Sequence, residues 1–235
     1  MSAILSNLQA VKTAINNAAI AVHRDPASVQ LLAVSKTFPE AAIRAAYTAG
    51  QRAFAENYLQ ESLLKIAALR DLKIEWHFIG PIQSNKTRDI AENFDWAHGV
   101  DRLKVAERLS AQRPKNLAPL NICLQINVSG EVSKSGVATN EVAALAQALA
   151  KLPGIKLRGL MAIPAPSDDP QAQRQPFAQL QKIMNHLNAQ GLHLDTLSMG
   201  MSHDFPAAIA EGATMVRIGT AIFGQRPPVS SIIDG

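Results

Sequence analysis

The fold is decided by the stretch Leu31-Leu32-Ala33-Val34-Ser35-Lys36, which is followed by Thr37-Phe38-Pro39. Its four apolar residues run without a break and stop at a serine, a lysine and turn-forming residues. A short continuous apolar run of this kind is typical of a buried strand in a parallel sheet, because both faces of such a strand are covered. Lys36 then follows the carboxyl end of the strand, where α/β folds bind their ligands.

A lysine at this place has two interpretations. Partial burial lowers the pKa of a lysine amine and frees it as a nucleophile toward carbonyl groups. Lysines are mostly exposed, however, so position alone favours an ordinary surface lysine at the start of a loop. The rest of the chain has to decide between the two.

The composition indicates a globular protein. The chain has 235 residues, of which 47% are hydrophobic and 18% are charged, so it can bury a sizeable core. Its formal charge of +4 is mildly basic, but the lysines and arginines are scattered, and we expect no nucleic-acid partner. The length fits one α/β barrel or two small domains.

Several other classes are disfavoured. The single cysteine, Cys123, lies in an apolar run and is expected to be a buried structural thiol, with no disulfide and no cysteine-based zinc site. No pair of histidines has metal-ligand spacing with partner ligands, so no metal is expected. No apolar run approaches the ~18 residues of a membrane span, and Asn7, Gln9 and Lys12 interrupt any signal-peptide pattern. We therefore expect a cytoplasmic protein with no membrane partner.

After a predicted amphipathic helix over residues 2–23, strand and helix patterns alternate in eight units. The strands are expected at 31–35, 52–55, 75–79, 95–98, 121–128, 156–163, 195–199 and 214–218. The helices are expected at 39–49, 58–69, 84–93, 102–112, 140–151, 176–189 and 205–211, with a short closing segment at 221–223. Alternation with short connections predicts a parallel sheet.

Eight units in this length fit a closed (β/α)8 barrel, the TIM barrel, better than an open doubly wound sheet. The glycine-rich dinucleotide fingerprint is absent after the first strand, which also disfavours a Rossmann fold. We expect one domain over residues 1–235 with a barrel core at about 30–225, and an extra first helix packed outside the barrel or over its floor. The polar loop 164–176 follows the sixth strand and is either a lid or an ordinary mobile surface loop.

Small and hydroxyl residues follow the last two strands, where barrels commonly bind phosphate. They are Ser198-Met199-Gly200-Met201-Ser202 after the seventh strand and Gly219-Thr220 after the eighth. Glycines let backbone N–H groups approach an anion closely, and hydroxyls donate to its oxygens. The alternative is that Ser202 or Asp204 only caps a helix and Gly219 only makes a turn.

Arg217 lies inside the eighth predicted strand. Pointing inward at the end of the barrel, it can only donate hydrogen bonds; it could also pair with a carboxylate such as Glu56. A nucleophilic lysine together with a phosphate site fits two kinds of barrel. These are lysine aldolases acting on sugar phosphates, and proteins that hold pyridoxal 5′-phosphate as an imine, for which an arginine beside the pyridine nitrogen is expected.

Several blocks resemble the pyridoxal phosphate homeostasis proteins, whose fold is similar to the barrel domain of alanine racemase. These blocks are Ala33–Thr37, Phe54–Tyr58, Trp76–Lys86, Asn127–Ser129 with Ser133–Gly136, Gly159–Met161, Ser198–Asp204 and Arg217–Gly224. The resemblance covers about residues 30–225, and the blocks Trp76–Lys86 and Ser198–Asp204 are its most specific parts.

The resemblance implies a set of cofactor-binding residues. Lys36 would form the imine with pyridoxal 5′-phosphate, and Arg217 would face the pyridine nitrogen. The phosphate would be held by Ser202, Gly219 and Thr220, with Ser198 or Gly200 nearby, and the ring pocket would be lined by Asn57 and His77. His77 also has a second interpretation, as a core histidine with satisfied hydrogen bonds. Many relatives carry a second lysine where this chain has Phe38; Lys134 is a candidate substitute.

Two functions compete. The first is a protein that binds and releases the cofactor for intracellular homeostasis, without robust turnover, and that hands it to client enzymes that depend on it. The second is an amino-acid racemase, which needs an acid/base group on each face of the substrate. Related racemases take the second group from a tyrosine in an additional domain of a partner subunit, and we expect no such domain here. We therefore expect the first function, and a monomer by default.

Overall fold

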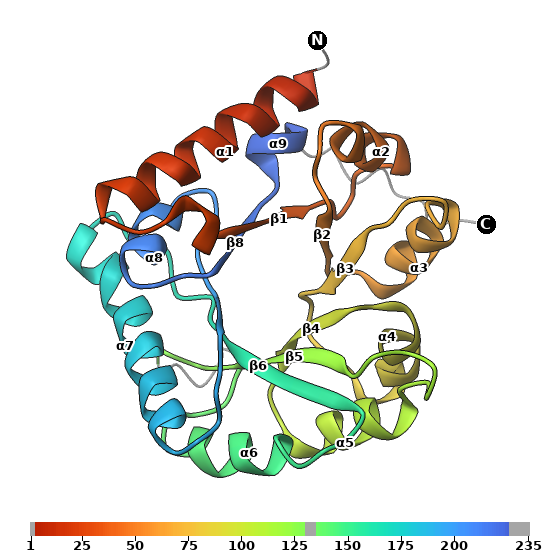
Figure 1. The fold of residues 1–235 in the computed structure, drawn as a ribbon, viewed down its shortest axis with the longest axis vertical. Coiled ribbons are helices and arrows are strands. Elements are labelled where there is room, and N and C mark those ends of the chain that lie inside the picture. Colours follow the sequence, from red (N-terminus) through yellow and green to blue (C-terminus); the bar gives the residue numbers. More distant parts are fainter. Residues whose placement is uncertain (1–2, 130–134, 226–235) are drawn as a thin grey trace.

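The strands predicted from the apolar runs close into one barrel. In the computed structural model, which describes residues 3–129 and 135–225, all neighbouring strands are parallel and pair in chain order, and the first pairs with the last (Figure 1). The strands are β1 (Gln30–Val34), β2 (Ala53–Glu56), β3 (Glu75–Phe78), β4 (Trp96–Val100), β5 (Leu120–Gln125), β6 (Ile155–Met161), β7 (Thr196–Ser198) and β8 (Met215–Ile218). The predicted TIM barrel is confirmed.

Helices surround the barrel on its outside (Figure 1). They are α1 (Ala3–Ala21), α2 (Glu40–Thr48), α3 (Leu59–Ala68), α4 (Thr87–Asn93), α5 (Leu103–Gln112), α6 (Val142–Leu149), α7 (Pro170–Ala189), α8 (Phe205–Ala210) and α9 (Thr220–Phe223), with short 3₁₀ turns η1 (Pro26–Ser28) and η2 (Ser84–Lys86). We call the carboxyl end of the strands the mouth of the barrel and the amino end its floor. Every βα loop therefore opens at the mouth.

The alternation of side chains along each strand produces two apolar cores. On β1, Leu31 and Ala33 pack outward in the core between the barrel and its helices, whereas Leu32 and Val34 pack inside the barrel. The inner cluster consists of Leu32, Val34, Ala53, Ala55, Trp96, Cys123, Met161 and Met215. Burial raises the pKa of the Cys123 thiol to about 12, so it is a protonated packing residue near neutral pH.

The first helix packs on the outside of the barrel. Helix α1 lies along α8 and α9 (Figure 1), burying Leu8, Val11 and Ile15 on its inner face. The Asn7 side chain donates from Nδ2 to the Ile222 carbonyl oxygen of α9 over 3.1 Å. Of the two expected positions for this helix, the structure therefore selects the one outside the barrel.

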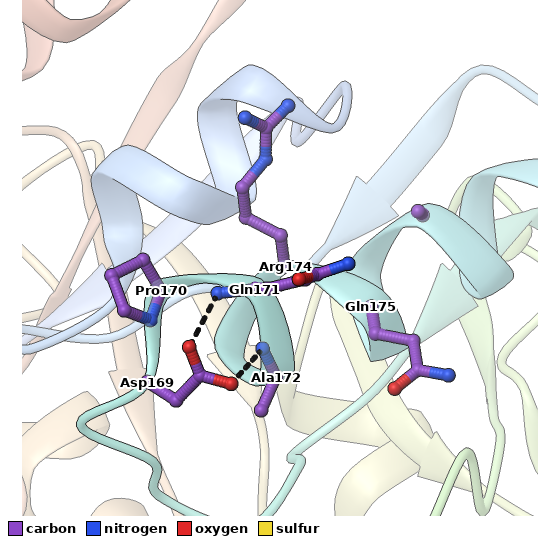
Figure 2. Close-up of a pocket in the computed structure, with 7 residues that line it drawn as sticks. Asp169, Pro170, Gln171, Ala172, Arg174 and Gln175 are labelled. Atoms are coloured by element: carbon purple, nitrogen blue, oxygen red, sulfur yellow. Dashed lines mark hydrogen bonds between the residues drawn. The ribbon is translucent and has the colours of Figure 1, made fainter.

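The predicted loop over residues 164–176 is wrong in its extent, because α7 already begins at Pro170. The Asp169 carboxylate accepts hydrogen bonds from the backbone N–H groups of Gln171 and Ala172 (Figure 2), and proline is well suited to the first helical position. Pro176 lies inside this helix, where it removes one backbone hydrogen bond.

An open cavity of about 690 Å³ lies over the first turns of α7, and its lining contains no predicted site residue.

No helix within residues 3–129 and 135–225 is long and apolar enough to cross a membrane. The same residues contain no group of three or more histidine, cysteine, aspartate or glutamate side chains that could hold a metal ion.

Candidate functional site

The barrel brings most of the predicted site residues to its mouth. Lys36 follows β1, Asn57 follows β2, Gly200 and Ser202 follow β7, and Gly219 and Thr220 follow β8. Two others lie within strands and are fully buried: His77 is inside β3, and Ser198 is the last residue of β7. Arg217 in β8 pairs in register with Leu32 of β1, which brings it close to the strand that carries Lys36.

The turn that carries Lys36 is held in an unusual backbone conformation. Thr37 has a φ of 68°, a region that β-branched residues rarely adopt. The Thr37 N–H donates to Glu61 Oε1 of α3 over 2.6 Å, and Lys36 itself is half-buried. The strain is therefore maintained by a specific contact beside the lysine, as is common at functional sites.

A buried ion pair lies beneath this turn. Lys65 of α3 donates from Nζ to Glu56 Oε1 over 2.9 Å and to the Ser35 carbonyl oxygen over 2.8 Å, and it also bonds Glu61. Ser35 Oγ donates to the same Glu56 oxygen over 2.6 Å. Burial raises the pKa of Glu56, while Lys65 and Ser35 oppose that shift. The partner of Glu56 is thus Lys65, and the alternative pairing of Glu56 with Arg217 is wrong.

Three buried oxygen atoms near the mouth lack a hydrogen-bond partner among the described residues. They are Thr37 Oγ1, Glu56 Oε2 and Asn57 Oδ1. A buried acceptor without a donor is costly and is usually satisfied by water or a ligand. Two of the three belong to residues next to Lys36 and at the predicted ring pocket. The mouth therefore offers unused polar atoms where the resemblance implies a cofactor.

The two predicted phosphate loops are tightly packed. Gly200 has a φ of 92°, and a Cβ there would lie 2.6 Å from Ala208 Cβ; a Cβ on Gly219 would lie 2.9 Å from the Val34 carbonyl oxygen. Glycine is therefore required at both positions. The Asp204 carboxylate accepts from the Met201 N–H over 2.6 Å, so it closes the loop instead of capping α8.

The phosphate loops also leave donors for an anion. Thr220 is the first residue of α9, so its N–H belongs to the first turn, where N–H groups have no acceptor within the helix. Its side chain is exposed and that of Ser202 is half-buried. Hydroxyls and N–H groups of this kind fit a phosphate.

Arg217 is a buried cation. It is 4% exposed, and it donates from Nη1 to Ser198 Oγ over 2.8 Å and from Nη2 to the Ala162 carbonyl oxygen over 3.0 Å. Burial lowers the pKa of Arg217 to about 10, so the guanidinium stays charged near neutral pH. It fits the predicted role of a fixed donor facing into the barrel.

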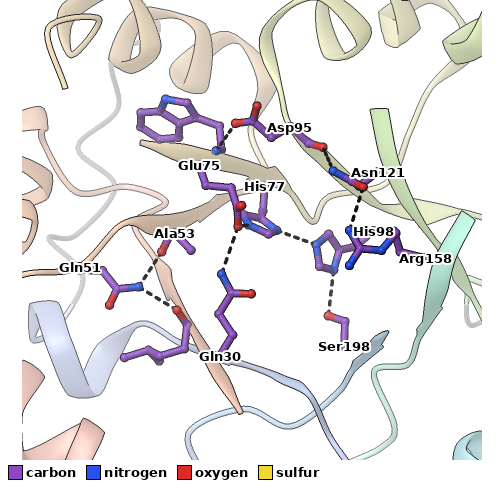
Figure 3. A network of polar contacts seen from close by, with 12 residues as sticks. Gln30, Gln51, Ala53, Glu75, His77, Asp95, His98, Asn121, Arg158 and Ser198 are labelled. Carbon is purple, nitrogen blue, oxygen red and sulfur yellow. Dashed lines mark hydrogen bonds and ion pairs between the residues drawn. The ribbon is translucent and has the colours of Figure 1, made fainter. Parts of the chain in front are cut away.

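His77 and Ser198 belong to one polar network inside the barrel (Figure 3). The two ring nitrogens of His77 contact Glu75 Oε1 over 2.7 Å and His98 Nε2 over 2.9 Å. His98 Nδ1 lies 2.8 Å from Ser198 Oγ. The hydroxyl of Ser198 therefore lies between Arg217 and His98, and both polar atoms of His77 are occupied by protein groups.

Sequence reasoning missed His98, Glu75 and Lys65. His98 and Glu75 were placed in strands without a role, because inward-facing contacts depend on the register of the closed barrel. Lys65 lies on α3 and is visible as a partner only once that helix is docked. The proposed substitute for the second lysine, Lys134, lies outside the described residues.

Comparisons with known proteins agree with the barrel fold. The family described as alanine racemase, N-terminal domain, matches residues 2–227. A pyridoxal phosphate homeostasis protein of Pseudomonas aeruginosa is 62% identical over 226 residues, which cover 96% of this chain and 97% of that protein. A protein of the same name from Escherichia coli K12 is 52% identical over 229 residues, which cover 96% of this chain and 98% of that protein.

Solved structures of other proteins have the same barrel fold. The structure of PipY from Synechococcus elongatus with PLP bound is 40% identical to this chain, with a TM-score of 0.83, and the match covers 94% of this chain and 100% of PipY. Alanine racemase from Corynebacterium glutamicum shares the fold, with a TM-score of 0.66 and 20% identity over 96% of this chain and 61% of that chain. The chain belongs to the alanine racemase N-terminal domain family, and its place within that family is among the pyridoxal phosphate homeostasis proteins.

The buried ion pair beneath Lys36 generates the first prediction. Lys65→Met should lower the free energy of unfolding by about 3–5 kcal/mol, because Glu56 is left as a buried carboxyl without its cation. The pKa of Glu56 is already raised by burial and should rise further. A raised pKa means that the folded state binds the proton more tightly, so the variant should lose stability as pH rises above the ordinary glutamate range. Urea unfolding at several pH values measures both effects.

The double variant Lys65→Met, Glu56→Gln serves as the control, because it removes the uncompensated charge and should recover much of the loss. Lys104→Met, at an exposed position of α5, should change stability by less than about 0.5 kcal/mol. A Lys65→Met variant as stable as the parent protein at pH 8 would contradict the assignment.

Proposed function

We propose that this chain binds pyridoxal 5′-phosphate covalently through Lys36 and takes part in intracellular homeostasis of that cofactor, without robust catalytic turnover. The observation that carries the proposal is the pairing of β1 and β8, which brings the half-buried Lys36 and the buried cation Arg217 to the same side of the mouth. The names of the relatives and the PLP-bound structure of PipY support it.

The proposal assigns roles to several residues at the mouth. The Lys36 amine would hold the aldehyde carbon, and the Arg217 guanidinium would lie beside the pyridine nitrogen. Ser202, Gly219 and Thr220 hold the phosphate, with Gly200 keeping its loop close. The unpartnered oxygens of Thr37 and Asn57 line the ring pocket, where they can accept hydrogen bonds from polar groups of the ligand. When bound, the cofactor supplies an electron-withdrawing ring attached to the lysine nitrogen.

The absence of robust turnover in this proposal rests on Arg217. A guanidinium only donates hydrogen bonds, and with a pKa of about 10 it keeps its proton near neutral pH. Beside a pyridine nitrogen, such a group would leave that nitrogen unprotonated, and the ring would be a weak electron sink. An arginine at that position therefore favours storage of the cofactor over carbanion chemistry.

The second candidate is an enzyme similar to an amino-acid racemase, which the family match favours. Such an enzyme needs a second acid/base group opposite Lys36. Tyr47 lies on α2, outside the barrel, and the Arg52 guanidinium carbon lies 3.9 Å from the centroid of its ring. Tyr58 follows β2 and is 51% exposed, so it is poorly shielded from water. Neither tyrosine resembles a buried, positioned acid/base group.

The proposal extends to the setting of the protein. We place it in the cytoplasm as a monomer that passes the cofactor to enzymes dependent on it. These statements rest on the family and on the names of the relatives. If the protein had no affinity for the cofactor, the alternative hypothesis would be a lysine aldolase that acts on sugar phosphates.

The covalent role of Lys36 predicts a visible absorption band. The purified protein, alone or after addition of pyridoxal phosphate, should absorb as a yellow imine, and Lys36→Ala should not. Lys104→Ala, on the exposed face of α5, should keep the band. A parent protein that shows no band after addition of the cofactor would contradict the proposal and direct the test to sugar phosphates.

The phosphate loops predict a selective loss of affinity. The variant Ser202→Ala, Thr220→Ala should weaken binding of pyridoxal phosphate by about tenfold or more, since charge-assisted hydrogen bonds to the phosphate are lost. Binding of unphosphorylated pyridoxal should change little. Both dissociation constants can be measured by absorbance titration, and equal weakening of the two ligands would move the phosphate site elsewhere.

The proposed role of Arg217 predicts that the protein loaded with the cofactor has no sustained activity on amino acids. Incubation of the loaded protein with common amino acids should give no sustained racemisation or transamination by chiral chromatography. Arg217→Glu, which lets the ring nitrogen be protonated, should change the pH dependence of the visible spectrum. Sustained turnover that is lost in Lys36→Ala would establish the enzyme instead.

A further inference from the structure

A continuous row of polar side chains runs through the barrel from its floor to Arg217. Glu75 begins β3 at the floor, His77 follows on the same strand, His98 lies on β4, and Ser198 ends β7. The three inner members are fully buried, whereas the Glu75 side chain is 42% exposed. We call Glu75, His77, His98 and Ser198 the relay. It links solvent at one end of the barrel to the buried cation at the other.

The two ends of the relay fix the direction of every hydrogen bond in it. At one end, the Arg217 guanidinium can only donate, so Ser198 Oγ accepts from it. At the other end, an ionised Glu75 can only accept, so His77 carries its proton on Nε2. His77 Nδ1 is then an acceptor, and His98 Nε2–H donates a hydrogen bond to it. His98 Nδ1 is in turn an acceptor for the Ser198 hydroxyl.

This single arrangement requires both imidazoles to be neutral, and their surroundings favour that state. Burial lowers the pKa of His77, and burial together with His77 and Arg217 lowers the pKa of His98 well below its usual value. His77 also stacks on the Trp96 ring at 5.4 Å with an interplanar angle of 13°. The charged groups around the relay are Asp95 and Arg158 near the floor, and Asp204 near Arg217. The hydrogen bond from His77 lowers the pKa of Glu75, so this carboxylate is ionised at neutral pH.

The direction of the relay matters for Arg217. Within the described residues, its hydrogen bonds go to a hydroxyl and a backbone carbonyl, Ser198 Oγ and Ala162 O, and not to a carboxylate. Asp204 acts on Arg217 only from a distance, and a buried cation with no carboxylate in hydrogen-bond contact relies on aligned dipoles to compensate for its lost hydration. In the fixed arrangement, Ser198 and both imidazoles present their lone-pair sides toward Arg217. The carboxylate at the far end keeps all of them aligned.

We propose that Glu75, His77, His98 and Ser198 are positioning residues for Arg217: the exposed Glu75 carboxylate sets the tautomers of both buried histidines, and the aligned relay holds the guanidinium charged and directed at the ring site. The part of this inference that concerns the ring site rests on the proposed function. The tautomers and their dependence on Glu75 do not. A residue at the floor thereby sets a property of the mouth.

The test uses the full-length protein without added cofactor, labelled with ¹⁵N-histidine. Ring-nitrogen chemical shifts between pH 6 and 8 should show two histidines that remain neutral, both protonated on Nε2. The signals are assigned by their loss in His77→Gln and His98→Gln. In Glu75→Gln, whose side chain has the same size but can donate as well as accept, the preference should be lost and both tautomers should appear. Glu107→Gln, an exposed change on α5, should leave the spectrum unaltered.

A second measurement links the relay to the site. Glu75→Gln should weaken pyridoxal phosphate binding by about tenfold, the equivalent of one charge-assisted hydrogen bond, and should shift the visible band, whereas Glu75→Asp should restore much of both. Nδ1 protonation of either histidine in the parent protein, or tautomers unchanged in Glu75→Gln, would overturn the relay. If the parent protein shows no band with the cofactor, the proposed function fails, but the tautomer result still decides the relay.

Discussion

The constraint on which the interior depends is the positive charge of Arg217 inside a closed barrel. Transfer of a guanidinium from water into a protein interior is costly unless hydrogen bonds and charges compensate for its lost hydration. At 4% exposure, Arg217 receives that compensation from Ser198 and from the carbonyl of Ala162. The polar residues deeper in the barrel follow from this need. Histidines placed where a TIM barrel usually packs branched apolar residues are intelligible only as part of the same electrostatic arrangement.

A second buried cation, Lys65, lies beneath the turn at Lys36, and carboxylates compensate for its charge. Here the buried cation, Lys65, has two carboxylate partners, and the second of them, Glu61, also accepts the N–H of the strained Thr37. The ion pair therefore does more than offset charge, because Glu61 also holds the backbone beside Lys36. Packing alone would leave a loop after a strand mobile. A backbone held in one conformation at this turn suits the covalent role proposed for Lys36.

The sequence was sufficient for the barrel because its strand signal is local. Continuous apolar runs mark strands covered on both faces, and each run predicted an observed strand to within a few residues. The loop predicted over 164–176 is too long, because Asp169-Pro170 already begins helix α7 and proline suits the first helical position as well as a loop. The positions of Lys36 and Arg217 could be predicted because they follow or lie in named strands. The relay could not, since the contact of His77 with His98 and of His98 with Ser198 depends on how β3, β4 and β7 are staggered.

The held turn at Lys36 and the fixed guanidinium of Arg217 lie on adjacent strands of the barrel. The β1 side carries Lys36, whose turn is held by Glu61 and Lys65, and the β8 side carries the cation Arg217, which donates to Ser198. Because the strands are joined in register, with Leu32 opposite Arg217, neither side can move without distorting the sheet. Rigid elements of this kind keep two groups at a constant separation, which a ligand touching both requires. The two groups of the proposed site therefore depend on two neighbouring strands of one sheet.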